Sequence, residues 1–527
     1  MTPKKISQTR RAVLKEGALA AVAATFPTST LMGAQRETEP PYDLDGCKTY
    51  QEYKRLCRRR GMGLPAVSPD ADDPALAREG RSCMNCGRCD RACMNQQVAH
   101  WYRKEDLKDP ATRICMYCGQ CVSACIYNVL HEKLHFTTVA SGLESRSMPY
   151  DMPGGSESEN PVYVAMLAPA VRVAYGEFFG EAPGSNLESK IVGALRKFGF
   201  DYAFDVTFGA DLTTFEETRE FRERLRTETR LPLFTSCCPA WVRFVETFYP
   251  EYIPNLSTTR SPILAQSAAV KTMFAKEKGI APDSIVTVAF VPCVGKKYEA
   301  TRKENAASAK YWGSGEYRDL DYAITTREFG SWSAYERVKP DELEESEFDS
   351  VLGTGSGSGR LFGASGGVLA SVLREMYWEV EGRDPDASFL EFASVDGAPS
   401  RRETTAKIGD REIRAAIVSG LAPARALLED LKSGKVAYDA VEVMACPGGC
   451  VGGGGQPKGK EGAPPTDAQR AARAEGLKRA DANAPIRVSG KNPELQAFYE
   501  KFIEPGGDEL RESLLHTSYE KRDVWKS

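Results

Sequence analysis

The sequence predicts an α/β fold, with two lobes of mainly parallel sheets around a buried site. A small α+β segment precedes this fold and a short helical module follows it. Near-continuous apolar runs between residues 162 and 445, a repeated four-cysteine pattern and a helical periodicity over residues 485–527 predict these parts. A chain of 527 residues is also too long for one hydrophobic core.

The composition excludes several classes of function. The net charge of −4 leaves no electrostatic footprint for nucleic acid. No apolar run approaches the roughly 20 residues that span a bilayer. Fifteen cysteines are unusual, and an odd number cannot all pair as disulfides. Imidazole-rich metal centres lack ligands, since the only histidines are His100, His131, His135 and His516.

The N-terminus has the pattern of an export signal over residues 1–34. Arg10 and Arg11 precede the short apolar stretch Ala18–Phe26, and the pattern resembles a twin-arginine signal. We expect a periplasmic or extracytoplasmic protein, or a cytoplasmic one if this stretch is only a basic amphipathic start. Residues 35–74 are expected to be a linker with a short helical piece, and no role is assigned to their Cys47 and Cys57.

Two tight cysteine runs define a domain over residues 75–140. Each run has the spacing Cys-x2-Cys-x2-Cys-x3-Cys, whereas zinc ribbons need Cys-x2-Cys pairs set further apart. The pattern resembles bacterial ferredoxins with two 4Fe–4S clusters, in which the fourth cysteine begins a helix and binds the other cluster. The resemblance implies two crossed ligand sets: Cys83, Cys86, Cys89 and Cys125; and Cys115, Cys118, Cys121 and Cys93.

Residues 155–455 carry the clearest strands, and the chemical motifs begin where these strands end. Buried parallel strands have such near-continuous apolar runs, and ligands gather at their carboxyl ends. We expect the glycine runs at 353–359 and 452–455 to let backbone approach a bulky cofactor. The predicted strands are Val162–Ala168, Leu231–Thr235, Ile285–Val291 and Ala440–Ala445.

Five cysteines after these strands can serve a metal cluster. Four thiolates suffice to bind an iron–sulfur cube, and a fifth beside a ligand is available for proton transfer, which needs a donor with a pKa near ambient. Glu217 and Glu220 lie three apart on a predicted helix and share a face, where Arg224 can pair with Glu220. The cysteines are Cys237, Cys238, Cys293, Cys446 and Cys450.

The motifs Thr235–Trp241, Pro292–Glu299 and Glu442–Gln456 resemble the three signatures of the catalytic domain of iron-only (FeFe) hydrogenases. The resemblance implies an H-cluster, which is a 4Fe–4S cube joined to a diiron unit with carbonyl, cyanide and dithiolate ligands. It implies that Cys450 also bridges to the diiron unit, and that the ligands of the cube are Cys238, Cys293, Cys446 and Cys450.

The same resemblance implies a role for each further site residue. Cys237 would pass protons, and Lys296 would hydrogen-bond a cyanide, with Glu299 supporting the same network. Pro169 and Met444 would pack around the diiron ligands. The proton path would continue through Glu217, Ser257, Glu220 and Arg224.

The resemblance implies reversible oxidation of H2 to protons and electrons by heterolytic cleavage. Uptake with an outside redox protein, such as a cytochrome c or a ferredoxin, would suit an exported enzyme, and maturation proteins would supply the diiron unit. A hydrogen sensor, a non-catalytic iron–sulfur relative and a plain polyferredoxin are the alternatives. Residues 456–484 are expected to form a linker, and 485–527 resemble the small subunit of periplasmic FeFe hydrogenases.

Overall fold

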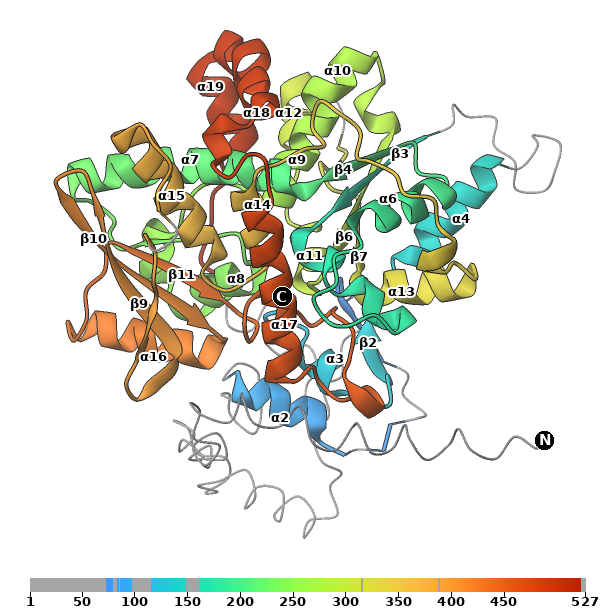
Figure 1. Cartoon of the computed structure of the whole chain (residues 1–527), viewed down its shortest axis with the longest axis horizontal. Helices are drawn as coiled ribbons and strands as arrows, with labels where there is room; N and C mark the ends of the chain where they lie inside the picture. The colour runs from blue at the N-terminus through green and yellow to red at the C-terminus, as the bar shows by residue number, and fades with distance from the viewer. Residues whose placement is uncertain are drawn as a thin grey trace, which may run out of the picture. The chain divides into compact units, whose positions relative to one another are not determined.

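The structure is a computed structural model, shown in Figure 1. It describes residues 73–78, 83–84, 86–96, 115–147, 161–313, 316–386 and 389–522, all within one compact unit, Leu64–Ser527. The predicted signal and the region of Cys47 and Cys57 lie outside the described residues. Within the described part, no helix is both long and apolar enough to cross a bilayer.

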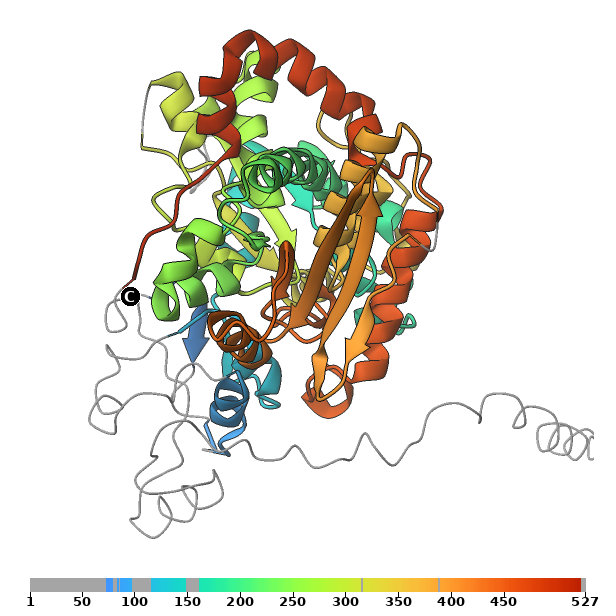
Figure 2. The ribbon, with the colours of Figure 1, turned by 90° about the vertical axis from the view of Figure 1, so that its left-hand side faces the viewer.

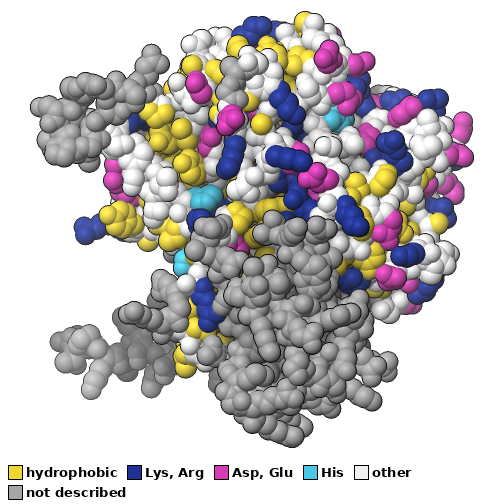
Figure 3. Space-filling view, turned by 180° about the vertical axis from the view of Figure 1, so that it is seen from behind, with side chains coloured by type: hydrophobic (Ala, Val, Ile, Leu, Met, Phe, Trp, Pro, Cys, Tyr) yellow, Lys and Arg dark blue, Asp and Glu magenta, His cyan; other side chains and the backbone are white. Residues whose placement is uncertain are grey.

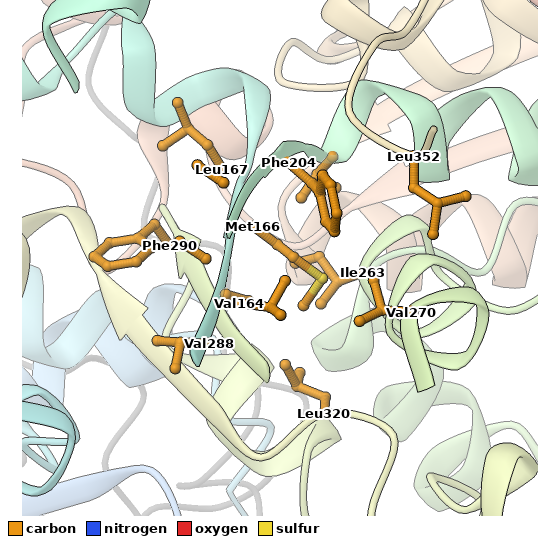
Figure 4. Close-up of a cluster of buried hydrophobic side chains, with 14 of the residues drawn as sticks. Val164, Met166, Leu167, Phe204, Ile263, Val270, Val288, Phe290, Leu320 and Leu352 are labelled. Carbon is orange, nitrogen blue, oxygen red and sulfur yellow. The ribbon is translucent and has the colours of Figure 1, made fainter. Parts of the chain in front are cut away.

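The first sheet is wholly parallel, as predicted. Its strands are β3 (Val162–Leu167), β4 (Tyr202–Asp205), β6 (Ile285–Val291) and β7 (Tyr322–Thr325), in the order β4-β3-β6-β7. Figure 4 shows side chains of β3, β4 and β6 meeting those of the neighbouring helix and loops in one buried cluster. Burial on both faces explains why these strands are continuous apolar runs.

The second sheet is mixed, which corrects the expectation of mainly parallel sheets in both lobes. Its order is β5 (Leu233–Phe234), β11 (Ala440–Met444), β10 (Arg411–Ser419), β9 (Ala398–Ile408) and β8 (Ala393–Val395). The first three are parallel, and β8, β9 and β10 pair antiparallel. Figure 2 shows the long β9–β10 hairpin. A hairpin sheet with one solvated face alternates polar and apolar residues, so β9 shows no continuous apolar run.

Helices cover both sheets. The longest, α7 (Val206–Thr227), follows β4 directly and is capped by Asp205, which accepts a hydrogen bond from the Thr207 N–H at 3.0 Å. It confirms the helix predicted around Glu217 and Glu220. The others are α4 (Phe136–Ser147), α5 (Pro169–Arg172), α6 (Glu188–Lys197), α8 (Pro239–Phe248), α9 (Pro262–Ala269), α10 (Ala275–Lys278), α11 (Gly295–Glu299), α12 (Ala307–Trp312), α13 (Thr326–Tyr335), α14 (Gly357–Leu361), α15 (Gly367–Glu381) and α16 (Leu421–Lys432).

The cysteine-rich segment has a short antiparallel pair, β1 (Leu76–Arg78) with β2 (Leu130–Glu132), and two helices, α2 (Arg88–Asn95) and α3 (Gln120–Ala124). Gly87 and Gly119, with φ of 71° and 73°, stand directly before these helices. The left-handed conformation, which glycine adopts at little cost, ends each cysteine loop and starts the helix early. Cys93 therefore lies inside α2 and Cys125 directly after α3, which corrects the expectation that these fourth cysteines begin helices.

The C-terminal module begins inside the predicted linker. Residues 456–484 contain α17 (Asp467–Ala482), which starts with a capping box between Thr466 and Gln469. Its Arg473 is fully buried and pairs with Glu177 at 2.6 Å, so a charged segment that resembles a linker packs as a helix. Two more helices, α18 (Pro493–Phe498) and α19 (Glu504–Leu515), add buried apolar residues to the core of the first sheet.

Charges of both signs are mixed on the surface. On the face in Figure 3, basic and acidic side chains are interspersed wherever the structure is described. This distribution agrees with the small net charge of −4.

Candidate active site

The three motifs lie at the carboxyl ends of parallel strands from both sheets. Cys238 stands between β5 and α8, Cys293 follows β6 and Cys446 follows β11. Burial raises the pKa of each of these thiols, and the charge of Cys238 raises the pKa of Cys293, Cys446 and Cys450 further. Thiols that perturb one another in this way are close together. The fold thus gathers the four predicted ligands from motifs more than 200 residues apart.

Glycines allow the second and third motifs to pack backbone against backbone. The Gly455 N–H donates to the Pro292 carbonyl oxygen at 2.9 Å, and a Cβ at Gly453 would lie 2.3 Å from that same oxygen. Gly449, with φ of 89°, turns the chain into Cys450. The glycines at 452–455 therefore let the loop after Cys450 pack closely on the second motif, and their approach to a cofactor stays a prediction.

The other glycine run does not reach the cysteines. A Cβ at Gly355 would meet Thr207, at 2.3 Å from its Oγ1, and one at Gly357 would lie 2.3 Å from Asp481 Oδ1. The run at 353–359 thus packs on the start of α7 and the end of α17. This corrects the expectation that it approaches a cofactor, because close approach between helices demands glycine equally well.

The second cysteine run packs directly on the site. A Cβ at Gly454 would lie 2.6 Å from the backbone of Gly119, and Gln120 Nε2 donates to the Gly452 carbonyl oxygen at 3.2 Å. The Cys446 sulfur lies 3.8 Å from the carbonyl oxygen of Cys118. Two predicted cluster sites are therefore neighbours with no layer of side chains between their loops.

The structure also brings the crossed cysteine sets together. Cys83, Cys86, Cys89 and Cys125 line one common cavity. In the second set, burial raises the pKa of Cys121, and Cys115, Cys118 and Cys93 raise it further, as does Cys89 of the first set. The two sets therefore lie close together, and the crossed assignment stays a prediction.

The side chain of Lys296 contacts the backbone of the first motif. Its Nζ donates to Glu299 Oε2 at 2.7 Å and to the Cys237 carbonyl oxygen at 3.1 Å. Burial lowers the pKa of Lys296, but the carboxylate of Glu299 outweighs it and the net pKa is raised. The ammonium form is thus secured, and an ammonium group has three N–H donors, one more than these two bonds use.

The predicted proton-path residues form a continuous polar chain along α7. Ser257 donates to Glu220 Oε2 at 3.2 Å and also hydrogen-bonds Glu217. Arg224 donates to Glu220 Oε1 at 2.5 Å. Burial raises the pKa of Glu217 to about 8, and its Oε2 has no hydrogen-bonding partner among the described residues. A buried carboxyl with such a pKa both holds and releases a proton near neutral pH.

Cys237 lies between this chain and the thiols. Its pKa is raised by burial, then by the charges of Cys238, Cys450 and Glu217. This differs from the expectation of a pKa near ambient, because burial disfavours the thiolate. Met444 belongs to a buried apolar cluster against which Cys237 and Cys450 pack. Pro169, which is buried, opens α5 directly after β3.

Sequence reasoning assigned no role to Glu442, which is fully buried in β11. Its carboxylate accepts hydrogen bonds from the N–H groups of Gly366 at 2.6 Å and of Val368 and Leu369 at 3.0 Å, all at the start of α15. Burial raises its pKa to about 7, and its charge contributes to the raised pKa of Cys237. The sequence feature that could have indicated Glu442 is that it is the one acidic residue within the apolar strand Ala440–Met444.

The donor set suits an iron–sulfur cube, because four thiolates suffice to bind one. Among the described residues, no group of three or more Cys, His, Asp or Glu side chains is arranged to hold one metal ion. A four-iron cube keeps its ligand sulfurs further apart than a tetrahedral zinc does. Four thiols, of which Cys446 is buried and the other three are partly buried, suit the larger group, with a glycine turn at Cys450.

Comparisons with known proteins agree with this geometry. Residues 161–454 match the family model described as iron only hydrogenase large subunit, C-terminal domain, and residues 467–522 match iron hydrogenase small subunit. The chain is 40% identical over 296 residues to the periplasmic [Fe] hydrogenase large subunit of Nitratidesulfovibrio vulgaris. The aligned region covers 56% of this chain and 68% of that protein.

A second relative is the NADP-reducing hydrogenase subunit HndD of Solidesulfovibrio fructosivorans. This relative is 38% identical over 68% of the present chain, and the present chain spans only 60% of the relative's length. The solved structure of a variant of the [FeFe]-hydrogenase HydA1 from Chlamydomonas reinhardtii aligns with a TM-score of 0.62 and 33% identity, over 73% of this chain and 98% of that one. The chain is also 29% identical, over 69% of its length and 87% of the relative's, to the cytosolic Fe-S cluster assembly factor narfl of Danio rerio.

Fold, thiol set and matches define an iron–sulfur protein of the oxidoreductase type, built around an α/β core. The chain belongs to the iron-only hydrogenase family, and it carries a small-subunit-like module at its C-terminal end.

Proposed function

We propose that the protein catalyses the reversible oxidation of H2 to protons and electrons. One observation carries the proposal: a chain of polar groups leads from Cys237, beside the four thiols, through Glu217 and Ser257 to Glu220. The side chain of Glu220 is 14% exposed, so the chain begins at a buried site and ends near solvent. A protein that only carries electrons has no need for such a path.

The H-cluster, bound by Cys238, Cys293, Cys446 and Cys450, would supply the site at which dihydrogen is split. The remaining N–H of Lys296 would donate to an anionic ligand there, a charge-assisted contact in a buried site. Pro169 and Met444 would exclude water around it.

The proton would leave by the polar chain. Cys237 passes its thiol proton to the carboxylate of Glu217 and regains one from the site. Glu217 passes a proton to the Ser257 hydroxyl as Ser257 releases its own to Glu220. Arg224 donates to Glu220 Oε1 and so pairs with the carboxylate once that proton has left. No net charge remains in the buried part of the route.

We propose that the electrons leave through two 4Fe–4S clusters bound by the crossed cysteine sets, toward a redox protein such as a cytochrome c or a ferredoxin. Replacing Cys125→Ser should remove a ligand from the set that includes Cys83 and leave the second set complete. Electron paramagnetic resonance should then lose one cluster signal. Loss of the cluster bound by Cys115 instead would contradict the crossed assignment.

The decisive test is an infrared spectrum of anaerobically matured protein in the carbonyl and cyanide region. Sharp bands that shift under H2, together with H2-dependent dye reduction, are expected. The variant Cys237→Ala should keep the bands but lose most turnover, since it removes only the thiol. If all cubes are present after confirmed maturation and no bands appear, hydrogenase activity is excluded.

The second candidate is a non-catalytic iron–sulfur protein, which the similarity to the assembly factor narfl favours. Such a protein would bind its cubes without a diiron unit, and a proton path would serve no purpose in it. The infrared spectrum separates the two candidates directly. A hydrogen sensor would show the same bands with negligible turnover.

We propose export by the twin-arginine pathway from the pattern in residues 1–34. Export of a folded chain suits cofactors inserted in the cytoplasm, and it favours H2 uptake with an external electron acceptor. Replacing Arg10 and Arg11 by Lys should retain the protein in the cytoplasm, which fractionation would detect. An unchanged distribution would overturn the proposal of twin-arginine export.

A further inference from the structure

Arg243 is a buried arginine at the junction between the second cysteine run and the catalytic motifs. It lies in α8, which starts at the first motif, and only 4% of its surface is exposed. Its Nε donates to the Cys115 carbonyl oxygen at 2.7 Å. The second motif meets the same loop, because a Cβ at Gly295 would lie 3.2 Å from the Tyr117 carbonyl oxygen. The guanidinium is therefore fixed against the backbone of a predicted cluster ligand.

The protein groups around this guanidinium are neutral. Its Nη1 donates to the Tyr298 hydroxyl at 2.9 Å, and its central carbon lies 5.1 Å and 4.8 Å from the ring centroids of Tyr117 and Tyr298. No carboxylate among the described residues forms an ion pair with Arg243, whereas Arg302 pairs with Glu246 of α8 at 2.8 Å. A buried charge without a counter-charge is costly. We therefore expect an anion beside Arg243 in the complete protein.

The thiol of Cys115 is close enough to supply that anion. Burial raises its pKa to about 12, the charge of Asp73 adds to this rise, and the charge of Arg243 acts against it. Asp73 itself accepts hydrogen bonds from the N–H groups of Ala75 and Leu76, at 2.8 and 2.7 Å. Metal binding requires the thiolate form, so a bound cube with its four thiolates would place negative charge beside Arg243. The buried guanidinium thus fits a cluster ligated by Cys115.

We propose that Arg243 is the buried counter-charge of the cluster that Cys115 ligates, and that it raises the reduction potential of this cluster. The inference rests on the proposed function, in which this cluster carries electrons away from the catalytic site. The cluster gains one negative charge when it accepts one electron, and a fixed positive charge stabilises the reduced form more than the oxidised form. Arg243 itself transfers neither an electron nor a proton. Its charge favours movement of electrons out of the catalytic site, which is the direction of H2 oxidation.

Two variants separate the charge of Arg243 from its packing. Arg243→Gln removes the charge and keeps a polar side chain, whereas Arg243→Lys keeps the charge. The measurement is a redox titration of the anaerobic full chain, followed by electron paramagnetic resonance. In Arg243→Gln, the ratio of reduced to oxidised cluster at a fixed potential should fall by roughly tenfold or more, and each tenfold corresponds to about 59 mV for a one-electron couple. Arg243→Lys should retain most of the wild-type potential.

The control removes the same charge from an exposed site. Arg222 on α7 has a side chain that is 51% exposed, and Figure 1 shows α7 well away from α3 of the second cysteine run. Arg222→Gln should leave the potential unchanged, because water and salt screen its charge. Cys115→Ser identifies the signal, since it removes or alters only the cluster in question. In active protein, Arg243→Gln should also slow H2 oxidation more than H2 evolution.

An unchanged potential in Arg243→Gln, or equal shifts in Arg243→Gln and Arg243→Lys, would overturn the proposal. If Arg243→Gln binds no cluster at Cys115, the iron content of Arg243→Lys decides: a restored cluster supports a counter-charge, and its absence from both variants assigns Arg243 a packing role. The titration needs no turnover. A wild-type protein with the signal but no H2 activity would therefore refute the proposed function alone, whereas a wild-type protein without this cluster would overturn the present inference whatever its activity.

Discussion

At the scale of single residues, Glu217 combines full burial with a pKa raised to about 8 by desolvation. The spacing of Glu217 and Glu220 predicts that they share a helical face. The burial of Glu217 and its closeness to Ser257, however, depend on contacts between α7 and a segment about 40 residues further along the chain. A helix period reveals which residues share a face, not what covers that face. The roles assigned to these side chains stay predictions.

Glu217→Gln should abolish proton release at this position while preserving its volume. We expect H2-dependent dye reduction to fall by roughly 100-fold or more, with unchanged iron content. Glu223→Gln, on the same helix and paired with Arg226 at the surface, is the matched control. A rate close to that of the wild-type protein in Glu217→Gln would mean that protons leave by another route.

The same residue predicts a pH dependence of stability. Its folded pKa of about 8 lies above the usual 4.5 of the unfolded chain, so its contribution is fully present below pH 4.5 and is lost as the pH rises through 8. Glu217→Gln removes this loss. The free energy of unfolding of the variant, relative to the wild-type protein, should therefore increase from pH 5 to pH 9 in urea titrations. A constant difference would contradict the raised pKa.

At the scale of elements, the predicted strands β3, β6 and β11 are present where the apolar runs lie, and β5 is shorter than expected. The β9–β10 hairpin and α17 were not predicted. Segment β9 carries charged residues such as Arg401 and Glu403 on one side, and α17 buries a charged residue, Arg473, among the few apolar residues of a charged sequence. Periodicity detects apolar faces, so it misses elements whose packing relies on ion pairs.

The junction of β4 and α7 depends on one carboxylate. Asp205 caps α7 and binds the fully buried Arg172 through both oxygens, at 2.6 and 3.1 Å. Asp205→Ala should lower the free energy of unfolding by about 3–5 kcal/mol, since it leaves a buried charge short of a partner. Arg226→Ala at the exposed end of α7 should cost less than about 0.5 kcal/mol. Comparable losses in urea titrations of both variants would refute the argument.

At the scale of the whole molecule, the C-terminal module is part of the main core. Leu495, Phe498 and Leu515 are buried within the cluster that covers the first sheet. The sequence indicated amphipathic helices in this module but not where their apolar faces pack, because that information lies in the shape of the partner surface. The expected linker boundary at residue 484 was wrong for the same reason.

Phe498→Ala should destabilise the entire unit rather than the module alone. Removing this fully buried ring should cost about 3–5 kcal/mol and move one cooperative transition, followed by near- and far-ultraviolet circular dichroism. Phe178→Ala, at a ring that is 39% exposed, should change little. Two separate transitions, with only the smaller one shifted, would show that the module unfolds independently.

Helices α17, α18 and α19 belong to the same chain as the cysteine-bearing domain, so dilution of the protein cannot separate them from it. Where such helices belong to a separate subunit, the fraction assembled falls as the concentration drops below the dissociation constant. Here the tether keeps the local concentration of the module near millimolar whatever the bulk concentration. Each molecule therefore retains these helices even at the picomolar levels of a single-molecule experiment, and its specific activity should not depend on enzyme concentration.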